Sequence, residues 1–259
     1  MGCFISGIRK LSPLGWLGWL LYQPYKWIVL TPFFVLSTLF FGFLTIALSF
    51  FMPSRWVSLI CGVFWSRLNG WLAPMFVEVT GQENVDEQQS YIVVANHQSF
   101  YDIYVLYGWL GIDFKWVMKQ EMRSIPGLGI GCEKVGHIFI DRTNPAAALE
   151  SIKEAGKRIV NGTSVLFFPE GTRSRDGLLQ RFKKGAFRFA LDLGLPILPV
   201  TIEGTREIFP PDSLDLLPGR VRLVIGKPIS VEGLDTSDLP RLMSEVREVF
   251  EQNRKVSSS

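Results

Sequence analysis

One of the two histidines in the chain lies five residues before an aspartate, directly behind a short apolar run. His97 and Asp102 belong to the stretch NHQSFYD, which follows YIVVA. If a strand ends here and Ser99 caps a helix, Asp102 falls in the first helical turn and its carboxylate can reach back to the imidazole. A carboxylate bonded to one ring nitrogen fixes the tautomer and leaves the other nitrogen free to accept a proton near neutral pH.

Such a pair has the chemistry needed to deprotonate an alcohol that attacks an acyl thioester, and no covalent acyl-enzyme is required. The nucleophile would then be the substrate's own hydroxyl. By spacing alone, a histidine that only caps a helix is an equally good interpretation. The chain has no GxSxG motif, which counts against a serine hydrolase.

A second cluster of polar residues follows another apolar run, in VLFFPEGTRSRDG. Pro169 stops the predicted strand, and one loop then carries the candidate binding residues Glu170, Gly171, Thr172, Arg173 and Arg175. Planar guanidinium groups bind phosphate through two bonds at once, so this loop is a candidate anion site. The alternative is a solvated turn, but open α/β sheets place ligands at the carboxyl ends of strands.

Further cations lie near these two clusters. Arg142 follows the short run HIFI and could join Arg173 around a phosphate, whereas we interpret His137 as a strand residue without a catalytic role. Downstream, RFKKGAFR adds more basic residues, of which Lys184 and Arg188 are expected to face solvent or lipid headgroups.

Alternating strand and helix signals after residue 76 must position these clusters. Short β-branched or aromatic runs occur at FVEVT, YIVVA, FKWVM, HIFI, SVLFF, ILPVTI and VRLVI, separated by helix-like segments. Two of the runs are apolar on both faces, as a sheet covered on both sides requires. We therefore predict an α/β fold whose mixed, largely parallel sheet has helices on both faces.

The N-terminal region indicates contact with lipid. Residues 27–52 carry no charge and would form a helix of roughly 39 Å at about 1.5 Å per residue, enough to cross a bilayer with tilt. Aromatic residues before this run are typical of a segment at headgroup level. A second apolar stretch, residues 56–76, is interrupted by Arg67 and Asn69 and is more typical of an interfacial or re-entrant helix.

Composition excludes several classes of protein. The three cysteines are scattered without a CxxC spacing, so neither a disulfide framework nor a metal site is expected. The net charge of +3 is too weak to indicate a nucleic-acid partner, although it suits a surface that faces anionic membrane lipid.

Taken together, NHQSFYD, GHIFIDR, FPEGTRSR and LPILPVTI occur in an order and spacing similar to the four sequence blocks of the glycerolipid acyltransferases. The chain most resembles the 1-acylglycerol-3-phosphate acyltransferases of that family, over roughly residues 76 to 230. The joint occurrence of the His-x4-Asp and Phe-Pro-Glu-Gly-Thr-Arg blocks is far more specific than either block alone.

The resemblance implies a role for each block. It implies that His97 is the general base and Asp102 its orienting partner. It implies that the acceptor is contacted by Glu170, Gly171, Thr172 and Arg173, with Arg142 in phosphate binding. Lys119 in MKQEM is a looser match to a further family lysine.

The expected activity is transfer of a fatty acyl group from acyl-CoA or acyl-carrier protein to the sn-2 hydroxyl of lysophosphatidic acid, with no cofactor beyond the acyl donor. One alternative keeps the chemistry on another lysolipid, such as a lyso-ornithine lipid or lysophosphatidylglycerol. A less favoured alternative is a non-catalytic protein that binds anionic lipid.

The expected organisation is a membrane anchor over residues 1–75, formed by a hairpin or by monotopic helices. An acyltransferase domain over 76–255 and a frayed tail over 256–259 follow it. Because both acyl donors are cytosolic, the catalytic domain is expected on the cytoplasmic face of a membrane, the inner membrane if the source is a bacterium.

Overall fold

The computed structural model describes residues 13–141, 154, 156, 159 and 161–256. Within them, seven strands form one sheet in the order β1-β7-β6-β2-β5-β3-β4. In chain order the strands are β1 (Met75–Thr80), β2 (Ile92–Ala95), β3 (Phe114–Lys119), β4 (Ile138–Ile140), β5 (Ser164–Phe167), β6 (Ile197–Glu203) and β7 (Gly219–Ile225). All seven predicted strands are therefore present. Of the tail predicted over 256–259, Val256 belongs to α11 and residues 257–259 lie outside the described residues.

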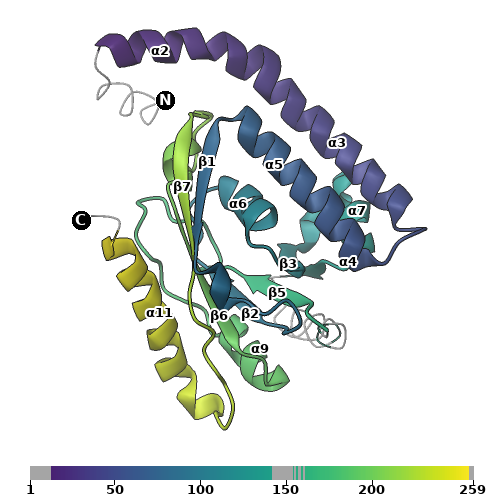
Figure 1. Ribbon diagram of the computed structural model, residues 1–259, viewed down its shortest axis with the longest axis vertical. Helices are drawn as coiled ribbons and strands as arrows, with labels where there is room; N and C mark the ends of the chain where they lie inside the picture. Colours follow the sequence, from purple (N-terminus) through teal and green to yellow (C-terminus); the bar gives the residue numbers. More distant parts are fainter. Residues whose placement is uncertain (1–12, 142–153, 155, 157–158, 160, 257–259) are drawn as a thin grey trace.

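The helical segments surround this sheet. They are α2 (Pro13–Pro24), η1 (Tyr25–Leu30), α3 (Thr31–Leu48), α4 (Ser54–Val57), η2 (Ser58–Gly62), α5 (Val63–Leu72), η3 (Gln82–Asn84), α6 (Tyr101–Trp109), η4 (Gln120–Ser124), α7 (Leu128–Lys134), α9 (Gly185–Leu193), α10 (Thr205–Ile208), η5 (Thr236–Asp238) and α11 (Leu239–Val256). Figure 1 shows α3, α5 and α6 on one side of the sheet and α9 and α11 on the other.

The pairing of the strands is parallel except between β6 and β7, which run antiparallel. Alternate residues of β2 enter different cores. Val93 and Ala95 pack into the core with α6, while Ile92 and Val94 pack into the core with α9 and α11. A strand buried on both faces must be apolar throughout, which explains the uninterrupted YIVVA run. The predicted mixed, largely parallel sheet with two covered faces is confirmed.

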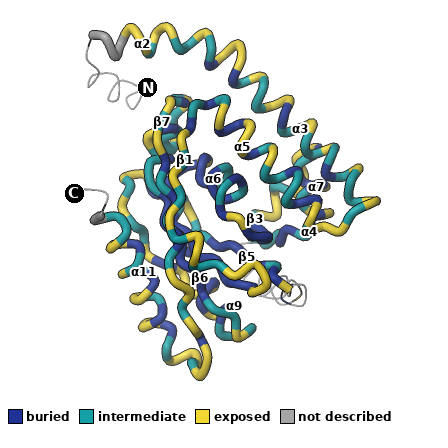
Figure 2. The backbone as a smooth tube through the Cα atoms, in the orientation of Figure 1, coloured by how far each residue is buried: buried dark blue, intermediate teal, exposed yellow. Residues whose placement is uncertain are grey.

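The first helix is longer than the sequence predicts. Pro24 and Thr31, at the junctions of α2, η1 and α3, both have right-handed helical dihedral angles, so the three segments form one continuous helix. Its described part runs from Pro13 to Leu48, instead of covering residues 27–52. Leu17–Leu48 is long and apolar enough to cross a membrane. Figure 2 shows that much of its outer face is exposed.

The second apolar stretch forms a shorter helix, from α4 to α5, that packs on α6. Its polar side chains face the protein: Arg67 donates through Nε to the Gly108 carbonyl at 2.8 Å, and buried Asn69 accepts from Ser37 Oγ at 3.0 Å. The two polar residues that interrupt this apolar segment in the sequence therefore contact neighbouring helices: Arg67 contacts α6 and Asn69 contacts α3. The predicted division into an anchor and a domain at residue 76 stays a prediction.

Candidate functional site

His97 and Asp102 meet at the carboxyl edge of the sheet, where β2 ends and α6 begins. The Nδ1 atom of His97 lies 2.8 Å from Oδ2 of Asp102. Because Nδ1 faces a carboxylate, it carries the ring proton in the neutral tautomer and donates it to Asp102, which leaves Nε2 as an acceptor. The predicted pairing of these two side chains is thus present in the structure.

The Asp102 carboxylate is fully buried and accepts hydrogen bonds on both oxygens. Oδ2 also accepts from the backbone amides of Gln98 at 2.6 Å and Ser99 at 2.9 Å. Oδ1 accepts from Oγ1 of Thr205 at 2.5 Å. Phe100, which directly precedes α6, has right-handed helical dihedral angles and no side-chain cap, whereas Ser99 Oγ accepts from the Tyr101 amide at 3.1 Å. Ser99 therefore supplies the side-chain cap that the sequence predicts.

His97 is held on its other sides by the loop that follows β5. Its backbone amide donates to Glu170 Oε1 at 3.0 Å, and its carbonyl accepts from the Ser174 amide at 2.8 Å. Its ring stacks on Phe168, with centroids 3.9 Å apart and planes 11° apart. β2 and β5 are parallel neighbours, so their carboxyl ends bring these two loops together. These contacts hold the ring in one orientation.

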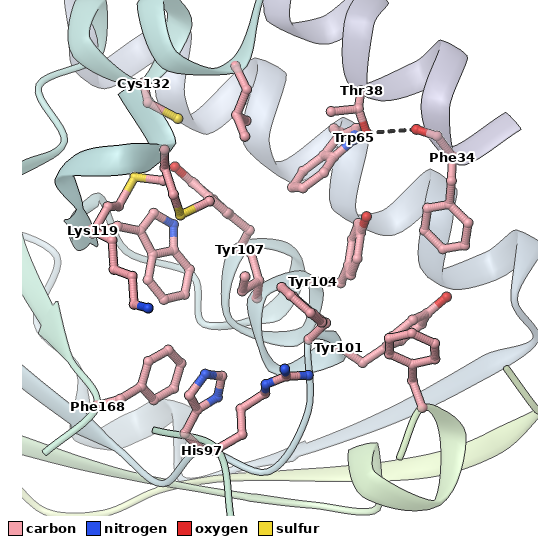
Figure 3. A pocket seen from close by; sticks show the side chains of 18 of the residues that line it. Phe34, Thr38, Trp65, His97, Tyr101, Tyr104, Tyr107, Lys119, Cys132 and Phe168 are labelled. Atoms are coloured by element: carbon pink, nitrogen blue, oxygen red, sulfur yellow. Dashed lines mark hydrogen bonds between the residues drawn. The ribbon is translucent and has the colours of Figure 1, made fainter. Parts of the chain in front are cut away.

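The imidazole faces a large apolar cavity of about 1320 Å³. Pockets for drug-sized ligands usually measure about 300–1,000 Å³, so this cavity has room for a long ligand. Its walls come from the first helix, α5, α6, β3 and α7, and include Phe34, Trp65, Tyr104, Tyr107 and Trp116. Figure 3 shows aromatic side chains lining the space above His97 and Phe168.

Four of the predicted loop residues line the cavity that His97 also lines: Gly171, Thr172, Arg173 and Arg175. Gly171 has a φ of +77°, which a side chain would strain, and this turn brings the loop back past His97. The Arg173 guanidinium lies over the Phe100 ring, 4.2 Å from its centroid. Lys119, at the end of β3, also lines the cavity, and its side chain extends toward the His97 and Phe168 side (Figure 3). The cations therefore gather at the end of the cavity that contains the imidazole.

One predicted binding residue, Glu170, does not line the cavity. It is buried, and its second oxygen accepts from the Gln180 amide at 2.9 Å, so it joins two loop segments beneath His97. Burial raises the pKa of Glu170, while the hydrogen bonds from Gln180 and His97 lower it. Arg142 lies outside the described residues.

His137 also lines the cavity and is buried just before β4. Its Nε2 contacts the Tyr107 hydroxyl, and its Nδ1 accepts from the Trp116 amide at 3.3 Å. Burial, together with a smaller effect of the nearby Lys115 ammonium, lowers the pKa of His137 to about 3. A histidine that stays neutral and has both nitrogens occupied is structural, as its place in the sequence indicated. Across residues 13–141 and 161–256, no cluster of metal-ligating side chains is found.

Several residues of the site escape sequence reasoning. Phe168 and Thr205 contact the His97 and Asp102 pair, but nothing in their spacing links them to it. Lys26 is buried in the first helix and donates to the Leu214 carbonyl at 2.8 Å at the cavity wall. A lone charge directly before the uncharged run was the available signal for Lys26.

The known proteins to which this chain is similar are acyltransferases. The family model described as Acyltransferase matches residues 76–203. The chain is 41% identical over 154 residues to the chloroplastic 1-acyl-sn-glycerol-3-phosphate acyltransferase BAT2 of Brassica napus, which covers 59% of this chain and 44% of that protein. It is 32% identical over 173 residues to 1-acyl-sn-glycerol-3-phosphate acyltransferase alpha of Mus musculus, covering 66% and 61%.

The solved structures include a similar chain. The crystal structure of the 1-acyl-sn-glycerophosphate (LPA) acyltransferase PlsC from Thermotoga maritima matches with a TM-score of 0.77 and 29% identity, covering 94% of this chain and 97% of that one. The match spans less than half the length of the Brassica relative. The likeness to PlsC, in contrast, includes the N-terminal helices as well as the sheet.

Proposed function

Since this chain belongs to the acyltransferase family, we propose that it transfers a fatty acyl group to the sn-2 hydroxyl of 1-acyl-sn-glycerol-3-phosphate, giving phosphatidic acid. The observation that carries the proposal is the His97 and Asp102 pair at the end of a long apolar cavity. Similarity to proteins named for this reaction supports it.

The geometry of the pair accounts for the proton transfers. Nε2 of His97 takes the proton from the acceptor hydroxyl as its oxygen attacks the thioester carbonyl carbon. Asp102 stabilises the imidazolium that forms, because its carboxylate is 2.8 Å from Nδ1. The new C–O bond forms, the C–S bond breaks, and the departing thiolate recovers the proton from Nε2. A protein that only bound anionic lipid would need the cations but not this buried pair.

The cations at the His97 end of the cavity would hold the acceptor phosphate. Arg173 can bind phosphate through two parallel N–H bonds, and Thr172 and Lys119 line the same end of the cavity. We propose that Arg142 joins them. The apolar walls beyond would hold a fatty acyl chain, since burial of each CH₂ group contributes about 0.8 kcal/mol.

The exposed side chains of the first helix support a membrane position for the protein. Leu36, Phe40 and Phe43 are exposed on α3, and the opposite side of the helix packs on α5 and α7. Gly42 lies so close to the Gly127 backbone that an added Cβ would come within 3.1 Å of it. Since the domain packs along α3, we propose that the helix enters one leaflet and does not cross the bilayer, with the domain on the cytoplasmic face.

A panel of acceptors tests the proposed substrate. Membranes containing the protein would be given acyl-CoA or acyl-carrier protein as the donor and one lysolipid at a time. Lysophosphatidic acid should be acylated faster than lysophosphatidylglycerol or a lyso-ornithine lipid, because a phosphate monoester offers most charge to the cations. Faster acylation of another lysolipid would keep the chemistry and reject the acceptor.

A further inference from the structure

The hydroxyl of Thr205 contacts the carboxylate oxygen of Asp102 that His97 does not use. Oγ1 of Thr205 lies 2.5 Å from Oδ1 of Asp102, and both residues are fully buried. We infer that Thr205 is a positioning residue for the His97 and Asp102 pair, an inference that rests on the proposed function for its catalytic consequence.

The sheet explains why a residue 103 positions later in the sequence reaches Asp102. β6 runs parallel to β2, with Ala95 opposite Val200, so both strands end at the same edge. Gly204 then turns the chain with a φ of +88°, and a Cβ there would lie 2.1 Å from the Arg220 carbonyl oxygen. Only a glycine fits this turn, and the turn directs Thr205 at Asp102.

Without Thr205, the carboxylate would lack a contact that fixes its rotation. Rotation about the Cβ–Cγ bond of aspartate is broad and roughly two-fold, so side-chain preference alone does not select an orientation. The Gln98 and Ser99 amides and His97 Nδ1 all bind Oδ2. The Thr205 hydroxyl is the donor on Oδ1 that the described residues supply, and it holds the carboxylate plane in the direction of the imidazole.

The segment that carries Thr205 is also tied to the cavity wall. Ser99 Oγ donates to the Phe209 carbonyl at 2.7 Å, and Phe209 lines the cavity with its ring 6.0 Å from that of Tyr101. The turn after β6 is thus joined to the loop after β2 by two side-chain hydrogen bonds. Thr205 acts at the centre of this junction and contacts no substrate, so its removal should change the rate more than substrate binding.

The test compares Thr205→Val, which keeps the shape and removes the hydroxyl, with Thr205→Ser, which restores it. Thr201→Val is the matched control, because Thr201 is equally buried on β6 but its hydroxyl accepts from Asn253 at 3.0 Å. With the full chain in membranes, Thr205→Val should lower kcat about tenfold with KM unchanged, as expected for loss of one hydrogen bond to a charged group. Thr205→Ser and Thr201→Val should stay near the wild-type rate.

A double-mutant cycle separates positioning from general loss of stability. In an Asp102→Ala background, Thr205→Val should leave the remaining rate unchanged, because its partner is gone. An equal loss in both backgrounds, or equal effects of Thr205→Val and Thr201→Val, would overturn the inference.

A second readout does not depend on the substrate. The His97 Nδ1 proton resonance should move in Thr205→Val and stay in place in Thr201→Val. An inactive wild-type protein would reject the proposed function while this resonance still decided the role of Thr205. No movement of the resonance in Thr205→Val would count against that role.

Discussion

The backbone amide of His97 donates a hydrogen bond to the buried carboxylate of Glu170, 73 residues later in the chain. This hydrogen bond holds the Glu170 side chain next to the His97 backbone and outside the cavity. The segments NHQSFYD and FPEGTRSR are therefore joined to each other, and Glu170 of the second segment supports the backbone of His97 in the first.

Replacing Glu170 should lower the rate without weakening acceptor binding. In Glu170→Ala the buried amides of His97 and Gln180 lose their acceptor, each at a cost of about 1–3 kcal/mol, so kcat and thermal stability should both fall. Glu170→Gln, which keeps one acceptor oxygen, should be intermediate. Steady-state kinetics is the test. A raised KM for lysophosphatidic acid at unchanged kcat would indicate that Glu170 contacts the acceptor directly, as the family resemblance implies.

Removing Arg173 should affect acceptor binding most. Arg173→Ala takes away the guanidinium at the cavity beside His97, so KM for lysophosphatidic acid should rise about tenfold or more, consistent with a lost charged hydrogen bond. Arg188→Ala is the control, since Arg188 is exposed on α9 and paired with Asp192. Equal KM values for the two variants would show that Arg173 does not bind the phosphate.

His137 should make the fold sensitive to acid. Its pKa is lowered from 6.5 to about 3 in the folded protein, so the unfolded chain binds more protons between these values. The free energy of unfolding should therefore fall as the pH decreases from about 6.5 toward 3. Urea unfolding at several pH values should show a weaker dependence in His137→Gln. An unchanged pH dependence in that variant would mean that other groups cause it.

The exposed face of α3 should bind the lipid surface. Leu36→Glu with Phe40→Glu places two charges on that face and should reduce sedimentation with phospholipid vesicles. Ser244→Glu with Gln252→Glu adds the same charge to exposed positions of α11, on the other side of the sheet, and should leave binding unchanged (Figure 1). Equal loss in both pairs would indicate a general charge effect and not a lipid-binding face.

The sequence was sufficient to predict the strands and the His97 and Asp102 pair because those signals are local. YIVVA is apolar on both faces, and a five-residue spacing across a strand end and a helix start determines which side chains can meet. Asp102 lies in the first turn of α6, and Ser99 Oγ accepts from the Tyr101 amide at the start of that helix, as the local pattern predicts.

The parts that could not be predicted depend on tertiary contacts. Glu170 and Thr205 meet the pair through strand order in the sheet, and no spacing within one segment encodes that order. The first helix extends well before its uncharged run, and its buried charge, Lys26, donates to the Leu214 carbonyl in a distant loop. The polar residues within the apolar helices are therefore the positions at which these helices form hydrogen bonds with other parts of the protein.

The most direct test of the proposed function is transfer of a radiolabelled acyl group from acyl-CoA to lysophosphatidic acid, in membranes containing the wild-type protein or His97→Ala. The wild type should form phosphatidic acid, and His97→Ala should be slower by about a hundredfold or more, because the general base is gone. Thr201→Val, made in parallel, controls for expression and folding. Equal phosphatidic acid formation by wild type and His97→Ala would contradict the assignment of His97 as the base.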